Sequence, residues 1–70
     1  MNENKERFVQ MLSEALTTVT DEVRRLEYNR DADGFEAVTL IFQGGSKHTI
    51  NVTGRNYAYI LNEIGFILSR

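Results

Sequence analysis

Apolar residues recur at three- and four-residue spacing in the first third of the chain, as they do on one face of a helix. This stripe consists of Phe8, Leu12, Ala15, Leu16 and Val19. Polar and charged residues occupy the positions between them. The pattern predicts a helix from about Glu3 to about Val19.

The segment Thr17–Leu26 admits two interpretations. Val23 and Leu26 would extend the apolar stripe, which favours a longer helix. The β-branched residues at positions 17–20 lower helix propensity, because their side chains lose rotamer freedom against the preceding turn. We therefore favour a helix that ends near Thr20, followed by a first strand over about Val23–Arg30.

Two β-rich runs flank the pair Gly44-Gly45 within the stretch Phe35–Thr53. A glycine pair between such runs is a hairpin signal, because the tight primed turns need positive φ angles. Strand alternation brings several apolar positions to one face; these are Val38, Leu40, Phe42, Ile50 and Val52. The opposite face would be polar apart from Phe35 and Ile41.

The last part of the chain reads as a second helix from about Gly54 to Ser69, with Thr53 as its N-cap. Its core stripe would consist of Tyr57, Ile60, Leu61, Ile64, Ile67 and Leu68. Gly65 lies on the flank of that stripe, where a glycine costs about 1 kcal/mol relative to alanine. Either close approach of the first helix compensates this cost, or the helix ends near Gly65.

This order of elements predicts an α+β fold of the type α-β-β-β-α. Its sheet would be a three-stranded antiparallel meander, with the two helices packed on one face. A length of 70 residues predicts a single domain over residues 1–70.

The second helix carries two aromatic residues away from its core stripe. Tyr59 and Phe66 are seven residues apart and fall nearly opposite the stripe, flanked by Asn62, Glu63 and Arg70. Exposed aromatic residues are typical anchors of protein interfaces. We therefore expect an interface at these five residues, formed with a second copy in a homodimer or with a larger protein.

The composition argues against metal sites and catalytic sites. The chain has no cysteine and a single histidine, His48, so thiolate and histidine-cluster metal sites are excluded. Asp31, Asp33 and Glu36 surround a glycine, but their spacing does not match a calcium loop, and Asp33-Gly34 is a hairpin signal. We expect a non-enzymatic protein without catalytic residues, metal or cofactor. With no signal peptide and no membrane span, a cytoplasmic location is expected.

Nucleic-acid binding is the alternative function. The basic residues best able to form a patch are Arg24, Arg25, Lys47 and Arg55. The α-β-β-β-α order resembles the double-stranded-RNA-binding domain, whose last helix begins with a lysine cluster. Here the stretch Gly54–Ala58 holds one basic residue, and the net charge is −2. The likeness is therefore one of topology.

A second resemblance covers more of the chain, from about Val23 to Ile64. Its motifs are Leu26-Glu27-Tyr28, Ala37-Val38-Thr39-Leu40, Gly45, Ile50-Asn51-Val52-Thr53 and Tyr57-Ala58-x-Ile60. These residues resemble small uncharacterised proteins of phages and prophages of Gram-positive bacteria. The resemblance implies a small accessory or inhibitor protein that binds a host or phage protein.

Overall fold

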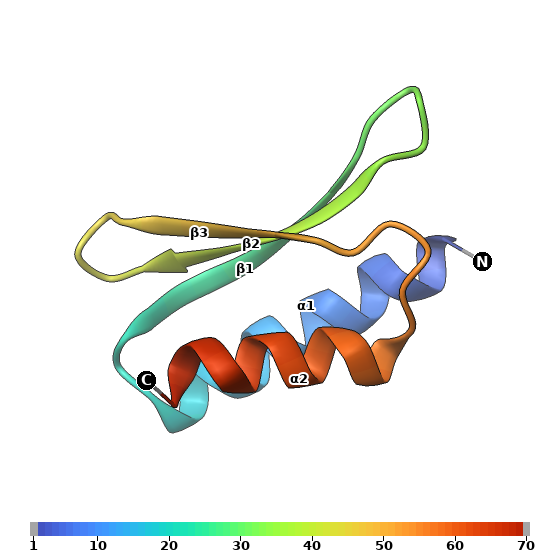
Figure 1. Cartoon of the computed structure of the whole chain (residues 1–70). Helices are drawn as coiled ribbons and strands as arrows, with labels where there is room; N and C mark the ends of the chain where they lie inside the picture. Colours follow the sequence, from blue (N-terminus) through green and yellow to red (C-terminus); the bar gives the residue numbers. More distant parts are fainter. Residues whose placement is uncertain (1, 70) are drawn as a thin grey trace.

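The computed structural model describes residues 2–69 and forms one antiparallel sheet with two helices on one side of it (Figure 1). The elements are α1 (Asn2–Val19), β1 (Val23–Arg30), β2 (Glu36–Phe42), β3 (Lys47–Asn51) and α2 (Tyr57–Leu68). The strands lie in the order β1-β2-β3. The predicted α+β meander with the order α-β-β-β-α is thus confirmed.

The chain leaves α1 where the β-branched run predicted the break. The Thr20 amide donates the last helical hydrogen bond to Leu16 O, and β1 starts at Val23, which is fully buried. The Ser13 hydroxyl accepts a hydrogen bond of 3.0 Å from the Leu26 amide. This bond ties α1 to the outer edge of β1, so the helical alternative for this segment is wrong.

Both predicted hairpins form, but the second uses a different turn. Gly34 has φ 91° and its amide donates to Asp31 O, which closes the β1–β2 loop. In the β2–β3 loop only Gly45 has a positive φ, at 97°, and its amide donates to Phe42 O. The expectation of a primed turn at this pair is therefore wrong.

The core lies between the sheet and the helices. It consists of Val9, Val23, Leu26, Val38, Leu40, Ile50, Val52, Ile60 and Ile64. Ile41 is also buried, although it belongs to the open face of the sheet. Its two cross-strand neighbours are Arg25 and Lys47, whose aliphatic stems can cover it.

Helix α2 begins three residues later than the sequence predicted, and Thr53 is not its cap. Gly54 has φ 70°, which is incompatible with a right-handed helical turn. The Thr53 hydroxyl instead accepts a hydrogen bond from the Glu36 amide. Asn56 caps the helix, since its side-chain oxygen accepts a bond of 2.9 Å from the Tyr59 amide.

Candidate interaction surface

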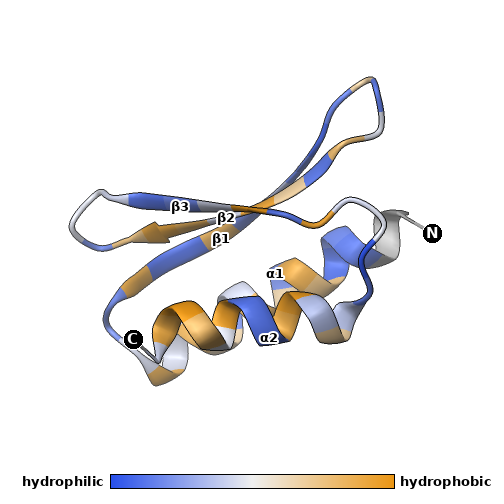
Figure 2. Ribbon diagram, viewed as in Figure 1, coloured by the Kyte–Doolittle hydropathy of each residue, from blue (hydrophilic) through white to orange (hydrophobic). Residues whose placement is uncertain are grey.

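The side of α2 that points away from the sheet carries no charged residue. This outer face of α2 consists of Ala58, Leu61, Asn62, Gly65 and Phe66, all exposed. Between Tyr57 and Leu68 the only charged residue is Glu63, which is half-buried. Figure 2 shows that the C-terminal half of α2 is coloured hydrophobic over most of its visible ribbon. Charged residues are depleted at the centre of protein interfaces compared with the rest of the surface.

Helix α2 is rotated relative to the predicted arrangement. Ile60 and Ile64 are its buried residues, while Leu61, which was assigned to the core, is 49% exposed. Tyr59, which was expected to face solvent, packs partly buried against the core. The guanidinium of Arg55 lies over its ring, 4.5 Å from the ring centroid. The expectation that Tyr59 is solvent-exposed is therefore wrong.

The other members of the predicted interface have separate positions. Phe66 is 64% exposed, as expected, and Asn62 is exposed beside it on the outer face of α2. Glu63 lies half-buried on the same flank as Tyr59. Arg70 lies outside the residues that the structure describes.

Helix α1 also carries exposed apolar residues. The two helices run side by side in the same direction (Figure 1). The ring of Phe8, in the second turn of α1, stacks on the ring of Tyr57 at the start of α2, with 4.4 Å between the ring centroids. Met11 and Val19 on α1 are 63% and 76% exposed, and Tyr57 is 40% exposed. We call Met11, Val19, Tyr57, Leu61 and Phe66 the helix-layer surface.

Nothing within residues 2–69 requires a glycine at position 65. Its φ is not positive, so the backbone does not require glycine there. A Cβ placed on it would meet no atom within 4 Å. The expectation that α1 approaches closely at Gly65 is therefore wrong, and α2 continues through this position to Leu68.

Two of the candidate nucleic-acid residues share the open face of the sheet. Arg25 and Lys47 lie on either side of Ile41 in the strand register. The Arg25 Nε atom is 2.8 Å from Glu27 Oε2, so its charge is compensated.

The other two basic residues lie elsewhere. Arg55 belongs to the turn before α2, over Tyr59, and Arg24 is exposed at the irregular step near the start of β1. The structure therefore does not gather the four basic residues into one patch.

A buried carboxylate joins α1, the sheet and the turn before α2. Glu36 is 6% exposed and is the only buried charged residue in the part of the chain that the structure describes. Its Oε1 accepts hydrogen bonds from Lys5 Nζ at 2.8 Å and from the Gly54 amide at 3.3 Å. Its Oε2 accepts one from the Tyr28 hydroxyl. Lys5 Nζ also donates to Val52 O.

These partners explain two shifted pKa values. The hydrogen bonds from Lys5 and Tyr28 lower the pKa of Glu36 from 4.5 to about 2. Burial, together with the hydrogen bond to Glu36, raises the pKa of Tyr28 from 10.0 to about 12. Every polar atom of the cluster has a partner, so we regard it as a structural link. The sequence contained Glu36 and Lys5 but gave no sign that residues 31 positions apart would meet.

The acidic loop does not bring its three carboxylates together. Asp31 Oδ1 accepts hydrogen bonds from the amides of Asp33 and Phe35, while Glu36 turns into the protein. Among the described residues no group of three His, Cys, Asp or Glu side chains could hold a metal ion. The loop therefore has the turn chemistry that Asp33-Gly34 predicts.

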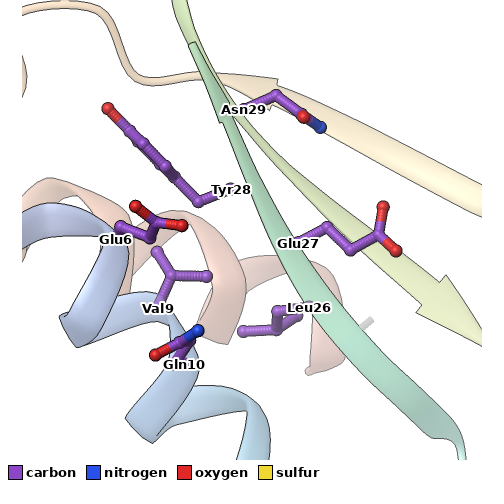
Figure 3. A pocket seen from close by; sticks show the side chains of 7 residues that line it. All are labelled: Glu6, Val9, Gln10, Leu26, Glu27, Tyr28 and Asn29. Carbon is purple, nitrogen blue, oxygen red and sulfur yellow. The ribbon is translucent and has the colours of Figure 1, made fainter. Parts of the chain in front are cut away.

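Two shallow depressions lie on the sheet. One, of about 390 Å³, runs along the free edge of β1 beside α1 (Figure 3). Glu6 and Gln10 reach toward it from α1, whereas Glu27 and Asn29 point to the other side of the strand. The second, of about 420 Å³, lies on the open face between Phe35, Thr49 and Asn51. Neither contains a nucleophile beside a base.

No protein family, no curated protein and no solved structure matches this chain. None of the helices in residues 2–69 is long and apolar enough to span a bilayer. The fold and the helix-layer surface are therefore the observations from which a function can be argued.

Proposed function

We propose that this chain is a small, cytoplasmic, non-enzymatic interaction protein that binds another protein chain through its helix-layer surface. The observation that carries the proposal is the charge-free outer face of α2, with Leu61 and Phe66 exposed on it. Burying one such side chain, compared with leaving it in water, is favourable by about 1.5–3 kcal/mol. A partner that covers them recovers this free energy.

The class of partner is either a second copy of the chain or a larger host or phage protein. The resemblance of Ile50–Thr53 and of the start of α2 to small phage and prophage proteins supports an accessory or inhibitor role. The compensated charge of Arg25 and the separation of Arg55 from Lys47 weigh against nucleic acid as the main ligand, because such binding depends on clustered positive charge.

Site-specific photo-crosslinking tests the proposal whichever protein is the partner. A benzophenone amino acid replaces Phe66 in one variant and Ala32, at the exposed tip of the β1–β2 loop, in a control. Both variants are irradiated in cells that produce the full chain. We expect a covalent adduct with a polypeptide from position 66 and none from position 32.

Equal adducts from both positions would show only random collisions and would overturn the proposal. A third variant carries the label at Leu61, in case the probe at position 66 is poorly oriented. The absence of any adduct from both position 66 and position 61 would also overturn the proposal. Circular dichroism of the purified variants confirms that each remains folded.

A further inference from the structure

We infer that the free edge of β1 binds an extended peptide segment of another protein, which carries a basic residue and adds to the sheet as a further strand beside Tyr28. This edge is a different surface from the helix-layer surface, so the inference does not depend on the proposed function. In this mode of recognition, main-chain hydrogen bonds hold a peptide along an exposed edge of a sheet.

The hydrogen bonds of β1 show which of its backbone groups face the free edge. In an antiparallel pair, the backbone groups of successive residues point alternately toward the neighbouring strand and away from it. The Asp31 amide donates to Phe35 O across the first hairpin, so the odd-numbered residues in the second half of β1 bond to β2. The Leu26 amide donates instead to Ser13 Oγ, which places the even-numbered residues on the free side.

Beside Tyr28 this edge has no partner. Within residues 2–69, neither the amide nor the carbonyl of Tyr28 makes a hydrogen bond, and the Leu26 carbonyl makes none either. The ligand complementary to such groups is another extended backbone, because its donors and acceptors repeat at the same spacing of roughly 7 Å for every second residue. A residue opposite Tyr28 can form two hydrogen bonds with it, and the Leu26 carbonyl can accept a third.

The hollow of about 390 Å³ beside this edge gives an added strand its room. Helix α1 covers the edge at Leu26, where Ser13 occupies the amide. One turn and more toward its N-terminus, α1 borders the hollow instead, and Glu6 and Gln10 reach toward it (Figure 3). An incoming backbone can therefore approach Tyr28 without displacing the helix.

The charge of the hollow indicates which peptide segment fits. Its charged lining residues are Glu6 and Glu27, both acidic. Glu27 is compensated by Arg25, whose Nε atom lies 2.8 Å from its carboxylate. Glu6 is exposed and takes no part in that pair or in the pair of Lys5 with Glu36. A lysine or arginine of the added strand would therefore find an available carboxylate on the α1 side.

The other edge of the sheet, along β3, is less suited to a basic peptide and supplies an internal control. Strand β3 is shorter, begins with Lys47 and has no acidic residue; short length and lysine are features that protect sheet edges from pairing. The Val52 amide donates to Glu36 O, so by the same alternation the Thr49 amide faces the free edge of β3.

Amide exchange measured by NMR on the full, isotope-labelled chain tests the inference. The probe is the peptide acetyl-Thr-Lys-Val-Lys-Val-Thr-amide, whose lysines lie on one side when it is extended. We expect a dissociation constant of about 1 mM or below. With about nine-tenths of the chain bound, exchange of the Tyr28 amide with water should slow about tenfold, because only the free fraction exchanges. Exchange of the Thr49 amide should not change.

Two controls separate strand addition from loose attraction between charges. The same peptide methylated on every backbone nitrogen keeps its lysines but has no backbone donor, so it should not slow exchange at Tyr28. Glu6→Gln should weaken binding about two- to fivefold, the range for an exposed ion pair. Glu14→Gln, which removes an exposed carboxylate elsewhere on α1, should leave binding unchanged. Circular dichroism confirms that both variants are folded.

Slower exchange at Tyr28 but not at Thr49, lost on methylation of the peptide and weakened by Glu6→Gln, supports the inference. It is overturned by unchanged exchange at Tyr28 with about 10 mM peptide, by equal slowing at Thr49, or by an equal effect of the methylated peptide. Equal affinities of Glu6→Gln and Glu14→Gln also overturn it. Phe66 does not line the hollow, so Phe66→Asp should bind the peptide like the wild type. A failure here is thereby distinguished from a failure of the proposed function.

Discussion

The substitution Glu36→Gln removes a buried charge while keeping nearly the same shape. Its effect can be worked from the pKa, which is lowered from 4.5 to about 2 by the hydrogen bonds from Lys5 and Tyr28. That difference corresponds to about 3 kcal/mol of stabilisation of the ionised form. The substitution also leaves Lys5, which is 11% exposed, without its counter-ion. We expect a loss of about 2–3 kcal/mol in the free energy of unfolding.

Such a loss is large for this chain. A 70-residue domain has a free energy of unfolding of about 4–10 kcal/mol. The expected fall in melting temperature is roughly 15 °C. Urea unfolding followed by circular dichroism at pH 7 measures the change. The matched control is Glu27→Gln, which breaks the ion pair between Arg25 and Glu27. Because these two side chains are 52% and 42% exposed, the control should lower the free energy of unfolding by less than about 1 kcal/mol.

The effect of Glu36 has a defined pH dependence. Because its pKa in the folded chain is lower than in the unfolded chain, its contribution is complete above about pH 4.5 and is lost as the pH falls toward 2. The difference in stability between the wild type and Glu36→Gln should therefore shrink over that range. A loss at pH 7 no larger than that of Glu27→Gln, or a difference that does not change with acid, would refute the reasoning.

Two further predictions concern Tyr28 and the glycines. Since the pKa of Tyr28 is raised from 10.0 to about 12, its contribution is complete below pH 10 and is lost between pH 10 and 12; absorbance of the phenolate and alkaline unfolding of Tyr28→Phe check this. Gly54→Ala should destabilise the fold by about 1–2 kcal/mol because φ is 70° there. Gly44→Ala, where φ is not positive, should change stability by less than about 0.5 kcal/mol in the same urea assay.

Local patterns predicted the elements because the deciding interactions are local. The β-branched run before Asp21 ended α1, and Asp33-Gly34 closed the first hairpin through the Asp31 side chain. The start of α2 was missed because two residues, Thr53 and Asn56, could both cap it. The choice depends on Glu36, 17 positions away, which holds the Thr53 hydroxyl.

The candidate surface was predicted in part. The helical wheel correctly placed Ile60 and Ile64 in the core stripe, but it added Tyr57 and Leu61 because they are apolar, and this moved the centre of the expected stripe toward their side of the helix. The same wheel placed Tyr59 on the solvent side, whereas Tyr59 packs partly buried against the core. A helical wheel assumes that a helix has one apolar face. When a helix has a core face and a second, exposed apolar face, the apolar stripe drawn on the wheel points between the two faces.

The measurement that tests self-association through the helix-layer surface most directly is the solution mass by sedimentation equilibrium over a range of micromolar concentrations. One chain has a mass of 8.1 kDa. We expect a mass of two chains for the wild type and of one chain for Phe66→Asp, with Thr49→Asp on the open sheet face remaining dimeric. A wild-type mass of 8.1 kDa at every concentration, or a dimer that Phe66→Asp leaves intact, would contradict self-association through the outer face of α2.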